Sequence, residues 1–228
     1  MEREIPLTGG RITQGVVRVG DRVHRPQCAN AGFVHSVLAH LSRKHIPYAP
    51  RFLGTDSRER EILSYMPGDV PDNLGRYAPE QCAAAARMIR ALHDALRDFP
   101  GCPDGMTVCH NDLSPCNFTF IDGLPAAVID WDAAAFGDPL DDLAYAAWMW
   151  LDAGNPDNHP ETVADGLRAM LRAYGAPDCA NLCARMLRQM ARVGASVFPT
   201  DAQTLATRRW TENCRRWLED FMQTHPGL

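Results

Sequence analysis

The first third of the chain alternates apolar and polar residues in short runs typical of strands. Residues 12–26, "ITQGVVRVGDRVHRP", form two β-branched runs around Gly20-Asp21, which predicts an antiparallel hairpin. Residues 32–46 change to apolar positions three and four apart, which predicts an amphipathic helix. Two more strand-like runs follow within residues 50–70, and Pro67-Gly68 ends them. We therefore expect a small lobe of strands and one helix up to residue 66.

Beyond residue 75 the spacing of apolar residues is mostly helical. Residues 78–99 have Pro79 near their start and a core stripe formed by Met88, Leu92, Leu96 and Phe99. Residues 126–151 predict a short buried strand, a polar loop and a helix, and three helices are expected from Pro160 onward. The rest of the chain is therefore expected to be a second, mostly helical lobe.

Composition and charge narrow the class of protein. Hydrophobic residues make up 46% and charged residues 22% of the 228, which is ordinary for a globular protein. A net charge of -5 gives no support for nucleic-acid binding. The longest clean apolar run, residues 144–151, is too short for a bilayer, which needs about 20 residues. The N-terminal sequence has no apolar signal-peptide core and the cysteines form no CxxC pair, so we expect a cytoplasmic protein with reduced thiols.

One short polar run carries candidate chemistry. Residues 109–120, "CHNDLSPCNFTF", place His110, Asp112 and Asn117 in the spacing H-x-D-x-x-x-x-N, just ahead of apolar residues. The sequence "VIDWD" then places Asp130 at the end of a predicted buried strand. Asp112 could accept a proton from an attacking hydroxyl group, while oxygens of Asn117 and Asp130 suit Mg²⁺ beside phosphate oxygens. The plainer alternative is that Asp112 only caps a turn.

These two stretches resemble the aminoglycoside phosphotransferase and choline kinase family, whose members are relatives of the protein kinases. "HNDLSPCN" is similar to the catalytic loop of that family, and "VIDWDAAAFGDPLDDLA" is similar to the stretch that follows it. The resemblance covers about residues 5–150. It implies an α+β, two-lobed protein-kinase-like fold, with a small antiparallel-sheet N-lobe in residues 1–66 and a mostly helical C-lobe in residues 67–228.

By position, the resemblance implies a role for each matching residue. Asp112 would be the catalytic base, and Asn117 and Asp130 would be the Mg²⁺ ligands. His110 would hold the catalytic loop, and Asp142 would support that loop from behind. The hinge would be formed by Ser64, Tyr65 and Met66, whose backbone groups would face adenine. The loop that covers the phosphates would contain Gly9 and Gly10. Two glycines near a terminus are also common in an ordinary turn, and we interpret His93 as an ordinary helix residue.

The chain departs from the family pattern in the N-lobe. The family expects a Lys on the third strand that grips the α- and β-phosphates and pairs with a Glu on the next helix. The strand "DRVHRP" has no Lys, and alternation puts Arg25 on the same face as Val23, so Arg25 is the expected replacement. The helix contains no Glu, and His35 lies near the expected position. Because two cations do not pair, the sequence predicts that the Lys–Glu clamp is absent.

The preferred function is transfer of phosphate to a hydroxyl group of a small molecule, with ATP or another nucleoside triphosphate and Mg²⁺. The rival is a kinase-fold binding protein, such as an immunity or antibiotic-resistance factor with little or no turnover. A protein kinase is disfavoured because no A-P-E segment follows Asp130. From residue 151 on, acidic residues and arginines balance, which gives no argument for a cationic aminoglycoside. We expect no nucleic-acid or membrane partner, and leave the acceptor and the oligomeric state open.

Overall fold

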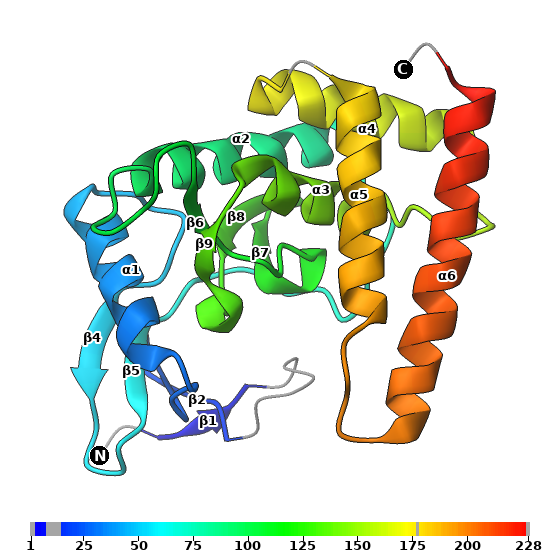
Figure 1. Cartoon of the computed structure of the whole chain (residues 1–228). Coiled ribbons are helices and arrows are strands. Elements are labelled where there is room, and N and C mark those ends of the chain that lie inside the picture. Colours follow the sequence, from blue (N-terminus) through cyan, green and yellow to red (C-terminus); the bar gives the residue numbers. More distant parts are fainter. Residues whose placement is uncertain (1–2, 8–14, 177, 227–228) are drawn as a thin grey trace.

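The structure is a computed structural model that describes residues 3–7, 15–176 and 178–226. The N-terminal part of the chain contains an antiparallel sheet, which lies at the lower left of Figure 1. Its strand order is β1-β2-β3-β5-β4. The strands are β1 (Ile5–Pro6), β2 (Val17–Val19), β3 (Arg22–Arg25), β4 (Phe52–Thr55) and β5 (Glu61–Ser64). The hairpin predicted around Gly20-Asp21 is confirmed, because Val17 pairs with His24 and Val19 pairs with Arg22.

Helix α1 (Ala31–Arg43) follows β3 and confirms the predicted amphipathic helix. Its apolar positions recur three and four residues apart and point to one side, so one face is buried: Val34, Val37, Leu38 and Leu41. That face packs against β4 and against the first helix of the next part of the chain. The helix therefore fixes the sheet to the helical region.

The remaining helices are α2 (Pro79–Leu96), α3 (Pro139–Trp150), α4 (Pro160–Tyr174), α5 (Cys179–Gly194) and α6 (Asp201–Thr224). Helix α2 packs on α4, and α5 packs on both α3 and α6. Figure 1 shows α5 and α6 side by side at the end of the molecule away from the sheet. Trp148 and Trp150 of α3 are buried in the core. The α+β class predicted from the sequence is confirmed.

Two short ladders lie between the sheet and the helices. Strand β6 (Thr107–Cys109) pairs with β9 (Ala135–Gly137), and β7 (Phe118–Ile121) pairs with β8 (Leu124–Val128). Cys109 lies opposite Ala135, and Phe118 lies opposite Val128. The loop from β6 to β7 and the loop from β8 to β9 therefore leave the ladders at the same end. These loops carry the two motifs.

The linker after β5 is attached to the β7–β8 hairpin. Asp69 and Phe120 exchange two backbone hydrogen bonds, at 2.9 and 2.8 Å. Gly68 has a φ of +122°, and a Cβ atom there would lie 2.5 Å from the Phe120 carbonyl oxygen, so only glycine fits without a shift. The last strand of the sheet, β5, ends at Ser64, two residues before the predicted boundary between the lobes at residue 66. The division of the chain into two lobes stays a prediction. Among the described residues, no helix is long and apolar enough to cross a bilayer.

Candidate active site

Asp142 of α3 holds the loop that follows β6. Its Oδ2 atom accepts a hydrogen bond from the His110 backbone N–H and its Oδ1 atom accepts one from the Asn111 backbone N–H, both at 2.8 Å. Asn111 has a left-handed φ of 64°, a conformation that Asn tolerates better than most residues. The two bonds therefore stabilise a strained turn immediately before Asp112. These hydrogen bonds fit the role predicted for Asp142, which is to support the loop from behind.

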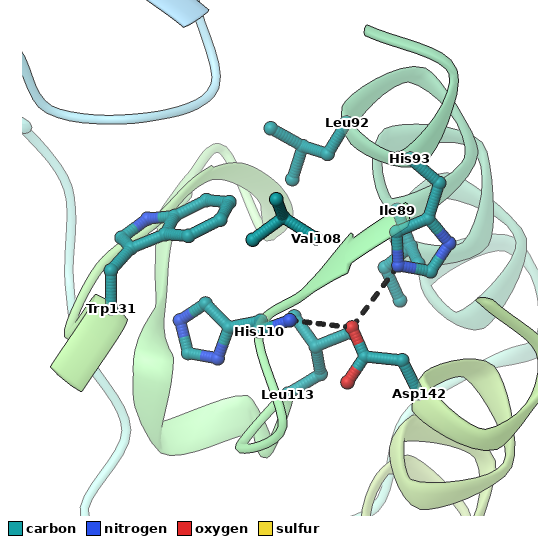
Figure 2. Close-up of a pocket in the computed structure, with 8 residues that line it drawn as sticks. All are labelled: Ile89, Leu92, His93, Val108, His110, Leu113, Trp131 and Asp142. Atoms are coloured by element: carbon teal, nitrogen blue, oxygen red, sulfur yellow. Dashed lines mark hydrogen bonds and ion pairs between the residues drawn. The ribbon is translucent and has the colours of Figure 1, made fainter. Parts of the chain in front are cut away.

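A buried chain of side chains lies behind Asp142. His93 of α2 donates from Nε2 to Asp142 Oδ2 at 3.1 Å (Figure 2). The other ring nitrogen, Nδ1, lies 2.8 Å from the hydroxyl of Tyr174. Burial alone would raise the pKa of Asp142, but the His93 hydrogen bond and charge and the His110 backbone N–H lower that pKa below its ordinary value. Asp142 is therefore a carboxylate at neutral pH.

The interpretation of His93 as an ordinary helix residue was wrong. His93 is 2% exposed and has a polar partner on each ring nitrogen. The sequence offered one weak signal, a His on the apolar side of a helix. Its partners lie 49 and 81 residues further along the chain, and local pattern does not identify such contacts.

His110 connects the two motif loops. Its Nε2 donates to the Ile129 carbonyl oxygen at 3.0 Å, and its Nδ1 accepts from the Asp112 backbone N–H at 3.3 Å. The ring also meets Trp131 edge to face, with 4.9 Å between ring centroids. Figure 2 shows His110 between Trp131 and Asp142. These contacts suit the loop-holding role predicted for His110, because they fix Asp112 relative to the residue before Asp130.

Both carboxylate oxygens of Asp112 have a donor. The Tyr145 hydroxyl donates to Oδ1 at 2.7 Å, and the Asn117 side-chain amide donates to Oδ2 at 2.9 Å. Burial, and then the neighbouring Asp112 charge, raise the pKa of Tyr145 well above its ordinary value. Tyr145 is therefore a neutral donor that orients Asp112, and it does not compete as a base.

Asn117 and Asp130 lie on adjacent segments. The Ile129 N–H donates to the Asn117 carbonyl oxygen at 2.9 Å, so the hairpin register brings Asn117 next to the residue before Asp130. Asp130 has a left-handed φ of 63°, and such strain in a non-glycine residue is common at functional sites. In the described part of the chain, Asn117 Oδ1 and Asp130 Oδ2 accept no hydrogen bond. Amide and carboxylate oxygens of this kind fit Mg²⁺.

Arg25 lies at the end of β3, among three carboxylates. Its Nε donates to Glu61 Oε1 at 2.5 Å, its Nη1 donates to Asp130 Oδ1 at 2.9 Å, and its Nη2 donates to Asp132. Burial alone would lower the pKa of Arg25, but these carboxylates outweigh it and raise that pKa further above its ordinary value. Arg25 is thus a permanent cation that contacts one candidate metal ligand, Asp130.

The prediction that the Lys–Glu clamp is absent needs an addition, because Arg25 has an acidic partner from another element. Helix α1 supplies no Glu, as expected, but Glu61 of β5 pairs with Arg25 and also accepts from His35 Nε2 at 2.7 Å. Arg25 and His35 are therefore joined by one shared carboxylate. Glu61 was not predicted because the family pattern places the acid on the helix, and the β3–β5 register that places Glu61 opposite Arg25 is a non-local property.

The predicted hinge residues lie at the end of β5 and directly after it. The Ser64 N–H donates to the Arg51 carbonyl oxygen at 2.9 Å, and the Tyr65 N–H donates to the Asp21 carbonyl oxygen at 2.8 Å. Within the described residues, the Met66 N–H and the Tyr65 and Met66 carbonyls have no backbone partner. Gly9 and Gly10, predicted to cover the phosphates, lie outside the described residues.

Comparison with known proteins supports the fold and the family resemblance. Residues 103–178, which contain both motif loops and Asp142, match the model of the phosphotransferase enzyme family. The solved structure of aminoglycoside phosphotransferase APH(3'')-Id from Streptomyces rimosus, in complex with ADP and streptomycin, is similar with a TM-score of 0.59 and 17% identity over 82% of this chain and 91% of that one. Choline kinase from Cryptosporidium parvum Iowa II is similar with a TM-score of 0.63 and 13% identity over 98% and 88%. The chain therefore has the protein-kinase-like fold of these enzymes, and the resemblance drawn from the motifs is confirmed.

A curated relative gives a more particular comparison. The trifolitoxin immunity protein of Rhizobium leguminosarum bv. trifolii is 33% identical over 169 residues, which are 67% of this chain and 63% of that protein. The match thus spans less than two thirds of the relative's length. Its name describes immunity to a toxin and gives no acceptor.

Proposed function

We propose that this chain is an ATP- and Mg²⁺-dependent phosphotransferase that acts on a hydroxyl group of a small molecule. The orientation of Asp112 carries the proposal, because Tyr145 and Asn117 hold both carboxylate oxygens beside the candidate metal ligands. Phosphoryl transfer requires a positioned base, oxygen ligands for Mg²⁺ and a cation on the phosphates. Asp112, the pair Asn117 and Asp130, and Arg25 would supply these three functions.

In the proposed reaction, Asp112 accepts the proton of the acceptor hydroxyl. The acceptor oxygen forms a bond to the γ-phosphorus, and the bond from that phosphorus to the β–γ bridging oxygen breaks, which leaves ADP. Bound Mg²⁺ would neutralise negative charge on the phosphates. Arg25 would grip phosphate oxygens through its two terminal nitrogens, and the backbone near Tyr65 and Met66 would bind the base. The reaction would take place in the cytoplasm.

The second candidate is a binding protein that confers immunity without turnover. The name of the Rhizobium relative favours it. So does the ion pair between Arg25 and Asp130, because the cation must leave this carboxylate before Asp130 can fully serve a metal. The candidates differ in one measurable property, since only the enzyme converts ATP to ADP with an acceptor.

The nucleotide part of the proposal is tested with Asp130→Asn. In the wild type, Mg-ATP at about 100 times its Kd should stabilise the fold by about 2.7 kcal/mol, or raise the Tm by about 5 to 10 °C. Asp130→Asn should lose most of that gain, because the amide lacks the charge that holds Mg²⁺. Thermal melting with ATP, with and without Mg²⁺, measures both values.

Asp122→Asn is the matched control, because Asp122 is exposed in the turn between β7 and β8. This variant should keep the full gain in Tm with Mg-ATP. An equal gain in Tm for Asp130→Asn and for the control would show that Asp130 is not a metal ligand.

A further inference from the structure

Three side chains from three elements form a polar cluster beside the candidate metal ligands, and two of them are buried. Arg25 of β3 and Glu61 of β5 lie directly opposite each other in the antiparallel register, and His35 extends from α1. Arg25 is 7% exposed and Glu61 is 1% exposed. The bonds from Arg25 Nε and His35 Nε2 use different oxygens of Glu61, at 2.5 and 2.7 Å. Glu61 is therefore a fully buried carboxylate with a donor on each oxygen.

This arrangement fixes Glu61 in one place. A buried carboxylate is costly unless its oxygens have donors, so Glu61 holds both neighbours. The His35 ring is itself held, because it stacks on Phe52 with 3.7 Å between ring centroids and 13° between planes. Helix α1 is thus connected to the sheet through His35 and Glu61.

The fixed Glu61 carboxylate determines the orientation of the Arg25 guanidinium group. A guanidinium group is planar and its donors form a rigid fork. Because Nε is bound to Glu61, Nη1 and Nη2 face away from Glu61 and toward Asp130 and Asp132. The two terminal nitrogens therefore point to the end of the site where phosphates would meet the metal.

We propose that Glu61 and His35 are positioning residues for Arg25, and that the three form a phosphate clamp whose acid comes from a strand and whose brace comes from helix α1. The inference rests on the proposed function, because it assumes that a nucleotide phosphate is the partner of Arg25. Without the Glu61 bond, Arg25 Nε loses its acceptor and the plane of the guanidinium group is no longer fixed. The clamp then no longer presents both terminal nitrogens to phosphate.

Glu61→Gln tests the clamp, and Mg-ATP and adenosine are the probes. Loss of a negative charge near the site would by itself strengthen the binding of an anion. We expect the opposite, a Kd for Mg-ATP that rises about tenfold with the Kd for adenosine unchanged, because a charge-assisted bond that orients Arg25 is lost. Isothermal calorimetry with both ligands measures the ratio. Arg25→Ala sets the maximum loss, and Glu59→Gln, at an exposed position in the same hairpin, is the matched control.

A pair of variants at His35 keeps the test decisive if Glu61→Gln fails to fold. His35→Leu removes the donor to Glu61 and should weaken Mg-ATP binding several-fold while adenosine binding stays constant. His35→Gln keeps an N–H group at nearly the same distance along the side chain and should restore most of the affinity. His159→Leu, at an exposed position, should change neither ligand.

The clamp and the proposed function would be contradicted by different results. Tighter Mg-ATP binding in Glu61→Gln, equal losses for both ligands, or no rescue by His35→Gln would overturn the clamp and leave the proposed function standing. A wild-type chain that binds neither Mg-ATP nor Mg-GTP would overturn both proposals together.

Discussion

Asp142 is a charged side chain in the interior that supports the loop carrying Asp112. Its two oxygens accept from two consecutive backbone N–H groups and from His93. Since its pKa is lowered in the fold, the charged form stabilises the native state. That contribution is present above the ordinary pKa of an aspartate and is lost as pH falls through the lower pKa of the folded state.

The pH dependence can be measured against Asp142→Asn, whose amide resembles a protonated carboxyl group. At neutral pH the variant should be less stable by about 3 kcal/mol or more, because His93 and two backbone donors lose a buried charge. The gap in free energy of unfolding should shrink as pH falls below about 3.8, since the wild-type carboxyl group becomes protonated too. Urea unfolding from pH 7 to pH 3 gives the gap. A gap that stays constant with pH would show that the charge of Asp142 adds no stability.

Among the elements, helix α3 carries both Asp142 and Tyr145, so its position matters most. The Asp138 side chain caps it by accepting from the Leu140 N–H at 2.8 Å, and Pro139 occupies the first turn. Arg185 of α5 bonds both Asp138 and Asp141, at 2.7 and 2.6 Å. These ion pairs are partly exposed and contribute little, so the cap is the stronger effect.

Asp138→Ala should therefore lower the free energy of unfolding by about 0.5 to 2 kcal/mol, the usual cost of losing a helix cap. Asp138→Asn keeps an acceptor for the Leu140 N–H and should remain within about 0.5 kcal/mol of the wild type. Chemical denaturation of the three proteins separates the cap from the ion pairs. Equal losses in both variants would assign the effect to Arg185 instead.

The sequence predicted the elements better than it predicted their partners. Local periodicity was sufficient for the β2–β3 hairpin, for α1 and for the helices after residue 75, because strand and helix spacing are local signals. It could not identify Glu61 as the partner of Arg25, which depends on the β3–β5 register across 36 residues. The burial of His93 beside Asp142 depends likewise on the packing of α2 against α3.

At the scale of the whole molecule, the sheet and the helical region are connected through a tight linker. Gly68→Ala should destabilise the fold by more than about 2 kcal/mol, because the new Cβ meets the Phe120 carbonyl oxygen and φ is positive. Gly123→Ala is the control, since Gly123 also has a positive φ but has open space around it. Its cost should be about 1 to 2 kcal/mol from the left-handed backbone alone. Equal costs by urea unfolding would mean that the contact at Gly68 relaxes freely.

The central claim is that the molecule transfers phosphate with Asp112 as the base. The most direct measurement follows transfer of the γ-phosphate of ATP to a panel of small alcohols and amines, for the wild type and for Asp112→Asn. The wild type should form a phosphorylated product only with Mg²⁺ present. The variant should stay folded, keep its Mg-ATP gain in Tm, and transfer phosphate about 10² to 10⁴ times more slowly. A variant that melts at a much lower temperature, while its folded fraction transfers phosphate at the wild-type rate, would contradict the account and leave Asp112 as a structural residue bonded to Tyr145 and Asn117.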